Sequence, residues 1–262
     1  MIRHLRIFLL LSILVFVALG QYLTVRRSTD WNGPLWVDVY AVDGSGTESA
    51  RRFIDSLKPD AFASVEQFFA LQAKRYEVPL EQPFRIRFAG ELGDSPPSVP
   101  DNGGLLSTVL WSLRMRWFVT RLHFASDDPT PDITVFAIYS DGEAGAALDK
   151  STALRKGMIA IANLYADRSV EGSNRMIVAH ELLHTLGATD KYDAATTLPL
   201  YPSGFAEPGR KPLYPQAEAE LMAGRIPIHA AGAAVPRSLD QVVIGPRTAH
   251  EIGWIESLPP MR

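Results

Sequence analysis

The 262-residue sequence contains no cysteine. This absence excludes disulfide bonds, thiolate zinc sites, iron–sulfur clusters and a cysteine nucleophile, so any metal ion must be held by histidine, aspartate or glutamate. Clustered positive charge is also lacking in most of the chain. Residues 1–27 hold four arginines and no acid, which leaves 22 basic and 29 acidic side chains in the remainder. Because nucleic-acid phosphates require clustered lysine and arginine, we expect no nucleic-acid partner.

The amino-terminal segment has the features of a membrane-targeting element. Residues 7–25 carry no charged side chain, and Arg26 and Arg27 close this run. A helix of this length would extend about 28 Å, close to the roughly 30 Å hydrocarbon core of a bilayer. Residues 1–27 are therefore predicted to be a membrane anchor or a cleaved signal peptide, with cleavage near Gly20. Either one places residues 28–262 on the extracytoplasmic side, membrane-anchored in the first case and secreted in the second.

Hydropathy patterns predict strands that alternate with helices as far as residue 187. The segments with strand patterns are 35–42, 84–90, 132–139 and 157–165. Helical spacing covers 48–76, with a break at Pro59, and runs from 103 to about 123. Beyond residue 187 the chain is rich in proline, glycine and tyrosine, with one more helix expected over 246–257. We expect one α/β (α+β) domain over 28–262, with an irregular lower part.

The segment 174–187 carries the residues that point to chemistry. It is expected to form a helix that Ser173 caps. His180 and His184 stand four residues apart, so on a helix they share one face and can present two imidazole nitrogens to one zinc ion. Glu181 lies about 100° around that helix, on the side where water would bind the metal. A zinc ion that lowers the pKa of water to about 7, next to a carboxylate base, is the arrangement of a metallohydrolase.

A third zinc ligand is expected from Asp190. Gly187 follows His184 by three residues and Asp190 follows it by six, which gives the pattern HExxHxxGxxD. Because glycine enters positive φ freely, the helix can end at Gly187 and the chain can turn back toward the metal. Asp193 is one alternative ligand, and Glu218 or Glu220 from a separate segment is another.

The segment from His180 to Asp190 resembles the extended zinc signature of the metzincin metallopeptidases, in the aspartate variant found in snapalysin-like enzymes. Residues 186–193 are also similar to the corresponding stretch of immune-inhibitor-A-like secreted peptidases. The resemblance implies a twisted mixed sheet with two long helices above an active-site cleft, an irregular lower subdomain and a C-terminal helix. It also implies a methionine turn, for which Met222 is the candidate, and makes 157–165 an edge strand that binds extended substrate.

These observations predict a zinc-dependent endopeptidase that acts on peptides or proteins. His180, His184 and Asp190 are expected to hold Zn²⁺, and Glu181 to act as general base. Three tyrosines are candidate donors to an oxyanion, namely Tyr192, Tyr201 and Tyr214. Two alternatives stay open: a zinc hydrolase of non-peptide amides or esters, and a catalytically silent zinc-binding module on the membrane. Glu181 argues against the second, because a structural zinc site has no use for a base.

Overall fold

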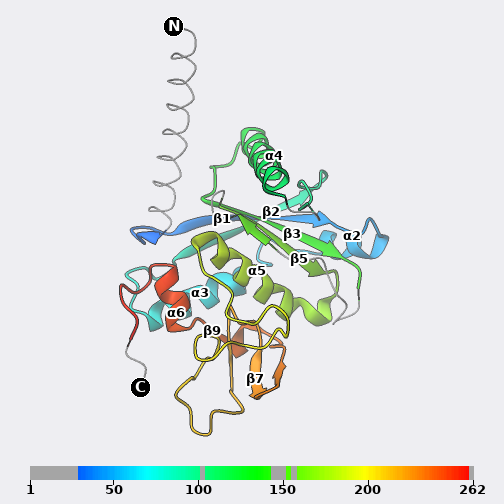
Figure 1. Ribbon diagram of the computed structural model, residues 1–262. Coiled ribbons are helices and arrows are strands. Elements are labelled where there is room, and N and C mark those ends of the chain that lie inside the picture. Colours follow the sequence, from blue (N-terminus) through cyan, green and yellow to red (C-terminus); the bar gives the residue numbers. More distant parts are fainter. Residues whose placement is uncertain (1–28, 101–103, 143–151, 155–157, 260–262) are drawn as a thin grey trace.

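A five-stranded sheet forms the centre of the computed structural model, which describes residues 29–100, 104–142, 152–154 and 158–259 (Figure 1). The strand order is β2-β1-β3-β5-β4. These strands are β1 (Leu35–Asp43), β2 (Phe84–Leu92), β3 (Ile133–Ser140), β4 (Thr152–Leu154) and β5 (Ile159–Tyr165). Neighbouring strands are parallel except β4, which runs antiparallel to β5. The predicted mixed α/β class is confirmed, and all four predicted strands form.

Helices cover both faces of this sheet. They are α2 (Glu48–Asp55), α3 (Ala63–Arg75), α4 (Leu105–Phe124), α5 (Glu171–Leu186) and α6 (Pro246–Glu251). Figure 1 shows α3 and α5 below the sheet and α4 above it. A large apolar cluster fills the lower interface, and a smaller one lies under α4. Burial on both faces explains the nearly continuous apolar sequences of β3 and β5.

The two long helices expected from the sequence form, but on opposite faces of the sheet. The predicted helix over 48–76 breaks around Pro59 into α2 and α3, as expected, because proline cannot continue a helix interior. The predicted helix from 103 to about 123 corresponds to α4. The pair of helices on the lower face is therefore α3 and α5.

The chain beyond α5 is largely irregular, as predicted. It contains the short strands β6 (Ala219–Glu220), β7 (Ile226–His229), β8 (Gly232–Ala234) and β9 (Val242–Val243). Single turns of 3-10 helix occur at Arg168–Val170 and Leu239–Gln241. The expected closing helix over 246–257 ends early, at Glu251, since Gly253 adopts φ +79°. A residue at this φ leaves the helical region and stops the hydrogen-bond ladder.

The first described residues are fixed against the last helix. The Trp31 indole donates a hydrogen bond to the Ile252 carbonyl at 2.8 Å, and its ring meets that of Trp254 edge-on at 5.8 Å. The predicted membrane anchor or signal peptide, residues 1–27, lies outside the described residues. Among the helices that the structure does describe, none combines the length and apolar character needed to cross a membrane.

Candidate metal centre

Helix α5 carries His180 and His184. The prediction for its first turn was wrong, and the prediction for its last turn is confirmed. Ser173 is not the cap, because the helix already begins at Glu171, after a 3-10 turn in which the Asp167 side chain accepts the Ser169 amide. The Ser173 hydroxyl instead donates to the Pro236 carbonyl at 3.2 Å. The other end is confirmed: Gly187 adopts φ +101° and ends the helix.

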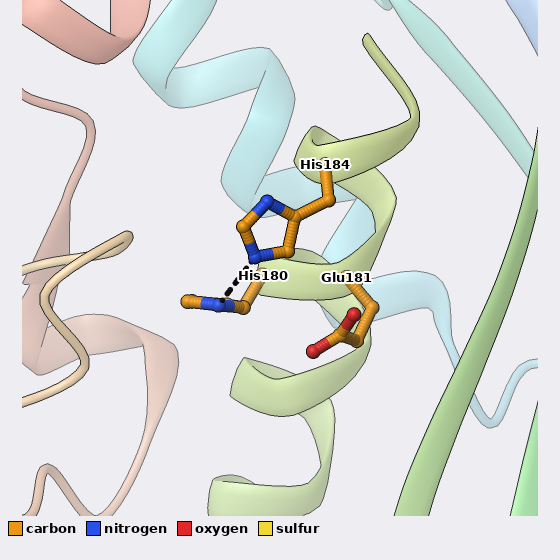
Figure 2. A group of neighbouring side chains, drawn as sticks. All are labelled: His180, Glu181 and His184. Carbon is orange, nitrogen blue, oxygen red and sulfur yellow. Dashed lines mark hydrogen bonds between the residues drawn. The ribbon is translucent and has the colours of Figure 1, made fainter. Parts of the chain in front are cut away.

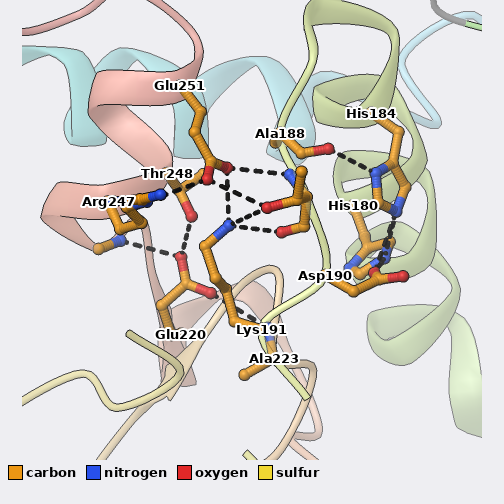
Figure 3. Close-up of polar contacts among 12 residues, drawn as sticks. His180, His184, Ala188, Asp190, Lys191, Glu220, Ala223, Arg247, Thr248 and Glu251 are labelled. Carbon is orange, nitrogen blue, oxygen red and sulfur yellow. Dashed lines mark hydrogen bonds and ion pairs between the residues drawn. The ribbon is translucent and has the colours of Figure 1, made fainter. Parts of the chain in front are cut away.

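Three ligand atoms converge beside the last turns of this helix. The Nε2 atoms of His180 and His184 are 3.0 Å apart (Figure 2). Asp190 Oδ1 lies 3.2 Å from each of these two nitrogens (Figure 3). A tetrahedral zinc ion with bonds of about 2.0–2.1 Å separates its ligand atoms by about 3.3–3.4 Å. The observed triangle is therefore only slightly smaller than one face of a zinc coordination sphere.

Hydrogen bonds on the far side of each imidazole fix its orientation. His180 Nδ1 lies 3.0 Å from the Leu221 carbonyl oxygen, and His184 Nδ1 lies 2.8 Å from that of Ala188. A carbonyl only accepts, so each Nδ1 carries the proton that it donates, and each Nε2 presents its lone pair when the ring is neutral. Carbonyl partners of this kind orient histidines that bind metals.

Glu181 points to the same side of the helix as the imidazoles (Figure 2). One ligand atom from each of His180, Glu181 and His184 lies within 4.8 Å of the others. The Glu181 side chain is only 5% exposed, and its Oε2 is buried with no hydrogen-bond partner among the described residues. Burial raises the pKa of this carboxyl, although the two imidazoles oppose the rise. A buried carboxylate oxygen without a partner is costly, so this atom points to a polar ligand such as water.

Asp190 and His180 each shift the pKa of the other. Burial alone would raise the pKa of Asp190, but the two imidazoles, which donate hydrogen bonds from Nε2 when they are protonated, hold it well below its usual range. Burial alone would lower the pKa of His180, but Asp190 and Glu181 together raise it. The Asp190 side chain remains 43% exposed. The candidate metal centre is thus open to solvent on the side of Asp190 and closed on the side of Glu181.

Met222 lies in a tight turn next to the site. The amides of Ala223 and Gly224 both donate to the Glu220 carbonyl at 3.0 Å, and Gly224 adopts φ +68°. The Met222 side chain is fully buried, and its carbonyl accepts the Lys191 amide at 2.9 Å. The preceding carbonyl, that of Leu221, is the one that orients His180. This turn therefore supports two of the three predicted ligands. The Leu221 carbonyl holds the His180 ring, and the Met222 carbonyl holds the backbone next to Asp190.

The alternative ligands lie elsewhere. Asp193 Oδ1 accepts the amides of Ala195 and Thr196 at 3.1 and 2.8 Å, which is the pattern of an aspartate turn. The buried Glu220 carboxylate accepts hydrogen bonds from Thr248 and from two backbone amides. Among the described residues, the group of metal-binding atoms consists of His180, Glu181 and His184 and contains no candidate for the third ligand. Asp190 is linked to it by its contacts of 3.2 Å to both imidazoles. Of the candidates for third ligand, the structure brings only Asp190 to the imidazoles.

Of the three candidate tyrosines, the structure places one beside the predicted ligands and the other two elsewhere. The Tyr192 hydroxyl hydrogen-bonds Asp190, and burial together with this carboxylate raises its pKa. Tyr201 and Tyr214 instead pack edge-on against the two sides of Phe205, with ring centroids at 5.4 and 5.8 Å. Tyr192 is therefore the tyrosine placed to donate a hydrogen bond near the ligands.

A buried ion pair, which the sequence did not indicate, fixes the backbone on both sides of Asp190. Lys191 Nζ contacts Glu251 Oε2 and the Thr189 carbonyl oxygen, each at 2.6 Å (Figure 3). Glu251 also accepts the Thr189 amide at 2.9 Å. Burial would raise the pKa of Glu251, but the Lys191 ammonium and Thr189 lower it on balance. Helix α6 thus holds residues 189–191 in place through Glu251, which lies 60 positions after Lys191 in the sequence.

Replacing Lys191 by Met is expected to lower the free energy of unfolding by about 2 kcal/mol, because the partly buried Glu251 carboxylate loses a charged hydrogen-bond donor and keeps only the exposed Arg247 as counter-ion. The variant is also expected to bind zinc about tenfold more weakly, since residues 189–191 lose their support. Denaturant unfolding and zinc titration measure the two effects. Arg247→Gln is the matched control: Arg247 contacts the same carboxylate at 3.3 Å but is exposed, so its loss should cost under about 1 kcal/mol.

Replacing Gly187 by Ala is expected to destabilise the protein by about 1–2 kcal/mol, because φ +101° is strained for any residue with a Cβ. Thermal unfolding measures this cost. The control is Gly33→Ala, at a position whose added Cβ meets no atom within 4 Å. Equal melting temperatures for the two variants would contradict a special role for the turn at Gly187.

The strand expected to bind substrate is not at the edge of the sheet. The antiparallel strand β4 pairs with β5 at Ile159–Ile161 and takes the outer position. Farther along β5, the Asn174 side chain bonds both the amide and the carbonyl of Tyr165. The prediction that 157–165 forms the edge was therefore wrong, because a three-residue strand without a recognisable pattern covers it.

A scan of the chain against protein-family models finds no match, and a comparison with curated protein sequences finds none either. The convergence of His180, His184 and Asp190, with Glu181 beside them, is therefore the feature from which a function can be inferred.

Proposed function

We propose that this protein is a zinc-dependent endopeptidase of the metzincin type. One observation carries the proposal: two imidazole nitrogens and one carboxylate oxygen form a triangle of 3.0, 3.2 and 3.2 Å, with the unpartnered Glu181 oxygen on the same side. The donor set of two histidines and one aspartate suits zinc, and three protein ligands are the number found in catalytic zinc sites. A structural zinc site would have four protein ligands and no base.

In the proposed reaction, His180, His184 and Asp190 hold the ion, and the carbonyls of Leu221 and Ala188 keep the imidazoles in place. When bound, zinc would polarise the scissile carbonyl and acidify a water molecule. Glu181 takes the proton of the attacking water at its buried carboxylate and delivers it to the leaving amine. Its burial and its oxygen without a hydrogen-bond partner leave this carboxylate free to exchange a proton with the water.

The Tyr192 hydroxyl has a supporting role in this proposal. It donates to Asp190 when the protein is free, and it is the tyrosine near enough to the ligands to reach a substrate oxygen. A hydrogen bond to the developing oxyanion would strengthen as negative charge accumulates there.

An extended peptide is the proposed substrate. Strand β4 is one edge of the five-stranded sheet, and α5, which carries the ligands, packs against it. A peptide paired with this edge would be held mainly through its main chain, which favours broad sequence tolerance. β4 thus replaces the segment 157–165 as the proposed binding strand.

Three further features support the metzincin type. The helix that carries the histidines ends at a left-handed glycine, Met222 lies in a tight turn below His180, and α3 and α5 share one face of a mixed sheet. Helix α4, on the other face, is not explained by this proposal. The membrane-anchored or secreted location proposed for residues 28–262 depends on residues 1–27.

The test combines metal analysis with a peptide digest. The purified protein is expected to contain one zinc ion per chain and to cleave a mixed peptide library; chelation should abolish cleavage and added zinc restore it. Hydrolysis of amide or ester model compounds without peptide cleavage would instead indicate a different zinc hydrolase. Stoichiometric zinc with no turnover on any of these would indicate a silent binding module.

A further inference from the structure

Helix α4 is apolar on two opposite faces. Its inner face packs on the sheet through residues that include Trp111, Met115 and Val119. Its outer face exposes a second stripe, made of Leu106, Val109, Leu110, Leu113, Trp117 and Phe124. Trp117 is 70% and Phe124 87% exposed. Because monomeric soluble proteins rarely expose so many large apolar side chains together, this stripe marks a contact surface.

The charges on α4 are all of one sign. The helix contains three arginines and neither aspartate nor glutamate, in a chain whose residues beyond 27 are acidic on balance. Arg114 follows Leu110 by four residues and Arg121 follows Trp117 by four, so both exposed arginines lie beside the outer stripe. Apolar and aromatic side chains flanked by arginine are the composition of helices that lie in the interface of an anionic membrane.

A third exposed aromatic side chain, that of Trp36, lies on the same side of the molecule. Trp36, Tyr40 and Val42 alternate along β1, so they point to one face of the sheet, and the last two pack under α4. Trp36, near the start of the strand, is 55% exposed. Tryptophan is enriched at the boundary between lipid and water, so its place beside α4 agrees with the same surface.

We propose that the outer stripe of α4 docks on the surface of an anionic lipid bilayer. The apolar stripe would enter the boundary between headgroups and acyl chains, while Arg114 and Arg121 extend their charged ends to the lipid phosphates. Three arginines make the helix unsuited to crossing the bilayer, in agreement with the absence of any spanning helix in the described residues. A symmetric contact with a second copy would bring like charges together, which disfavours that occupant.

Docking through α4 would orient the candidate metal centre. α4 lies on one face of the sheet, and α5, with the predicted ligands, lies on the other (Figure 1). A bilayer against α4 therefore leaves the metal centre facing away from the membrane, open to solvent on its Asp190 side. The docking proposal does not depend on the proposed peptidase activity, because it uses none of the site residues.

The test uses the full chain reconstituted into vesicles of phosphatidylcholine alone or of equal parts phosphatidylcholine and phosphatidylglycerol. Two readouts follow α4: hydrogen exchange of its amides, and quenching of tryptophan fluorescence by lipids brominated in the acyl chains. We expect slower exchange of residues 105–124 and strong quenching in the anionic vesicles, both reversed by high salt. Trp117→Phe should weaken the quenching, and Trp36 should account for what remains.

Two pairs of substitutions separate charge from apolar contact. Arg114→Gln with Arg121→Gln is expected to lower the docking equilibrium constant about thirtyfold, since each basic residue near an anionic surface contributes a factor of about five. Leu113→Gln with Trp117→Gln should abolish docking even at low salt. The matched control is Leu71→Gln with Lys74→Gln, at exposed apolar and basic positions of α3 on the opposite face, and it should change nothing. All three variants should keep the parent melting temperature, as the altered side chains are exposed.

Three results would overturn the proposal. Exchange and quenching that are identical in both kinds of vesicle would show that α4 does not contact an anionic surface. Protection that rises with protein concentration in the absence of lipid would show that a second copy covers the stripe. Protection that persists in detergent without phospholipid and at low protein concentration would show that another segment of the same chain covers it.

Discussion

Glu181→Gln is expected to lower peptide hydrolysis by about 10²–10⁴-fold while zinc remains bound, because the amide keeps the size of the side chain but cannot accept a proton. The effect should fall on kcat, since Glu181 acts on the reaction and not on substrate binding. Steady-state kinetics on a peptide that the parent protein cleaves measure the loss of turnover. The zinc content of the same sample shows whether the ion remains bound.

The control for this variant is Glu48→Gln, a change of the same size at a carboxylate that is 85% exposed on α2. It should leave kcat and zinc content at the parent values. Retention of normal turnover in the Glu181 variant would remove this residue from the mechanism. Loss of zinc along with turnover would show instead that the carboxylate is itself a ligand.

Asp190→Asn is expected to weaken zinc binding by at least about 100-fold, more than the 10–100-fold typical of residues that only orient a ligand. The amide keeps the geometry but loses the negative charge that lies 3.2 Å from both imidazole nitrogens. Competition with a coloured zinc chelator measures the affinity. At saturating zinc, any residual turnover reports on the remaining two-histidine site.

Asp193→Asn is the paired experiment. Its carboxylate is exposed and already accepts the amides of a turn, so zinc affinity should be unchanged apart from a small loss of stability. The opposite pattern, with weak binding in Asp193→Asn and normal binding in Asp190→Asn, would move the third ligand to Asp193.

The parts of the site that the sequence predicted are those encoded over short distances. The spacing of His180 and His184 follows from helical periodicity, and the helix end follows from the freedom of Gly187 to adopt positive φ. Asp190 is close enough in sequence that one turn of known kind brings it to the imidazoles. The four strands were predicted for a similar reason, since burial on both sides requires local runs of apolar residues.

The features that the sequence did not predict depend on distant partners. Nothing near Lys191 indicates that its partner is Glu251, because the pair forms only when the last helix reaches the metal centre. Strand β4 has three residues, too few to show alternation. In α4 the arrangement of apolar residues fits two opposite faces, so periodicity alone could not show which face is buried and which is exposed.

The contact between Lys191 and Glu251 has a consequence for how the protein matures. A polypeptide leaves the ribosome from its amino end, so the two imidazoles emerge long before the helix that steadies the loop bearing their carboxylate partner. The indole of Trp31, near the amino end, likewise gains its hydrogen-bond acceptor only when Ile252 is in place. Zinc binding of the proposed kind would therefore reach full affinity only after the segment that carries Glu251 has been synthesised and has folded against Thr189 and Lys191.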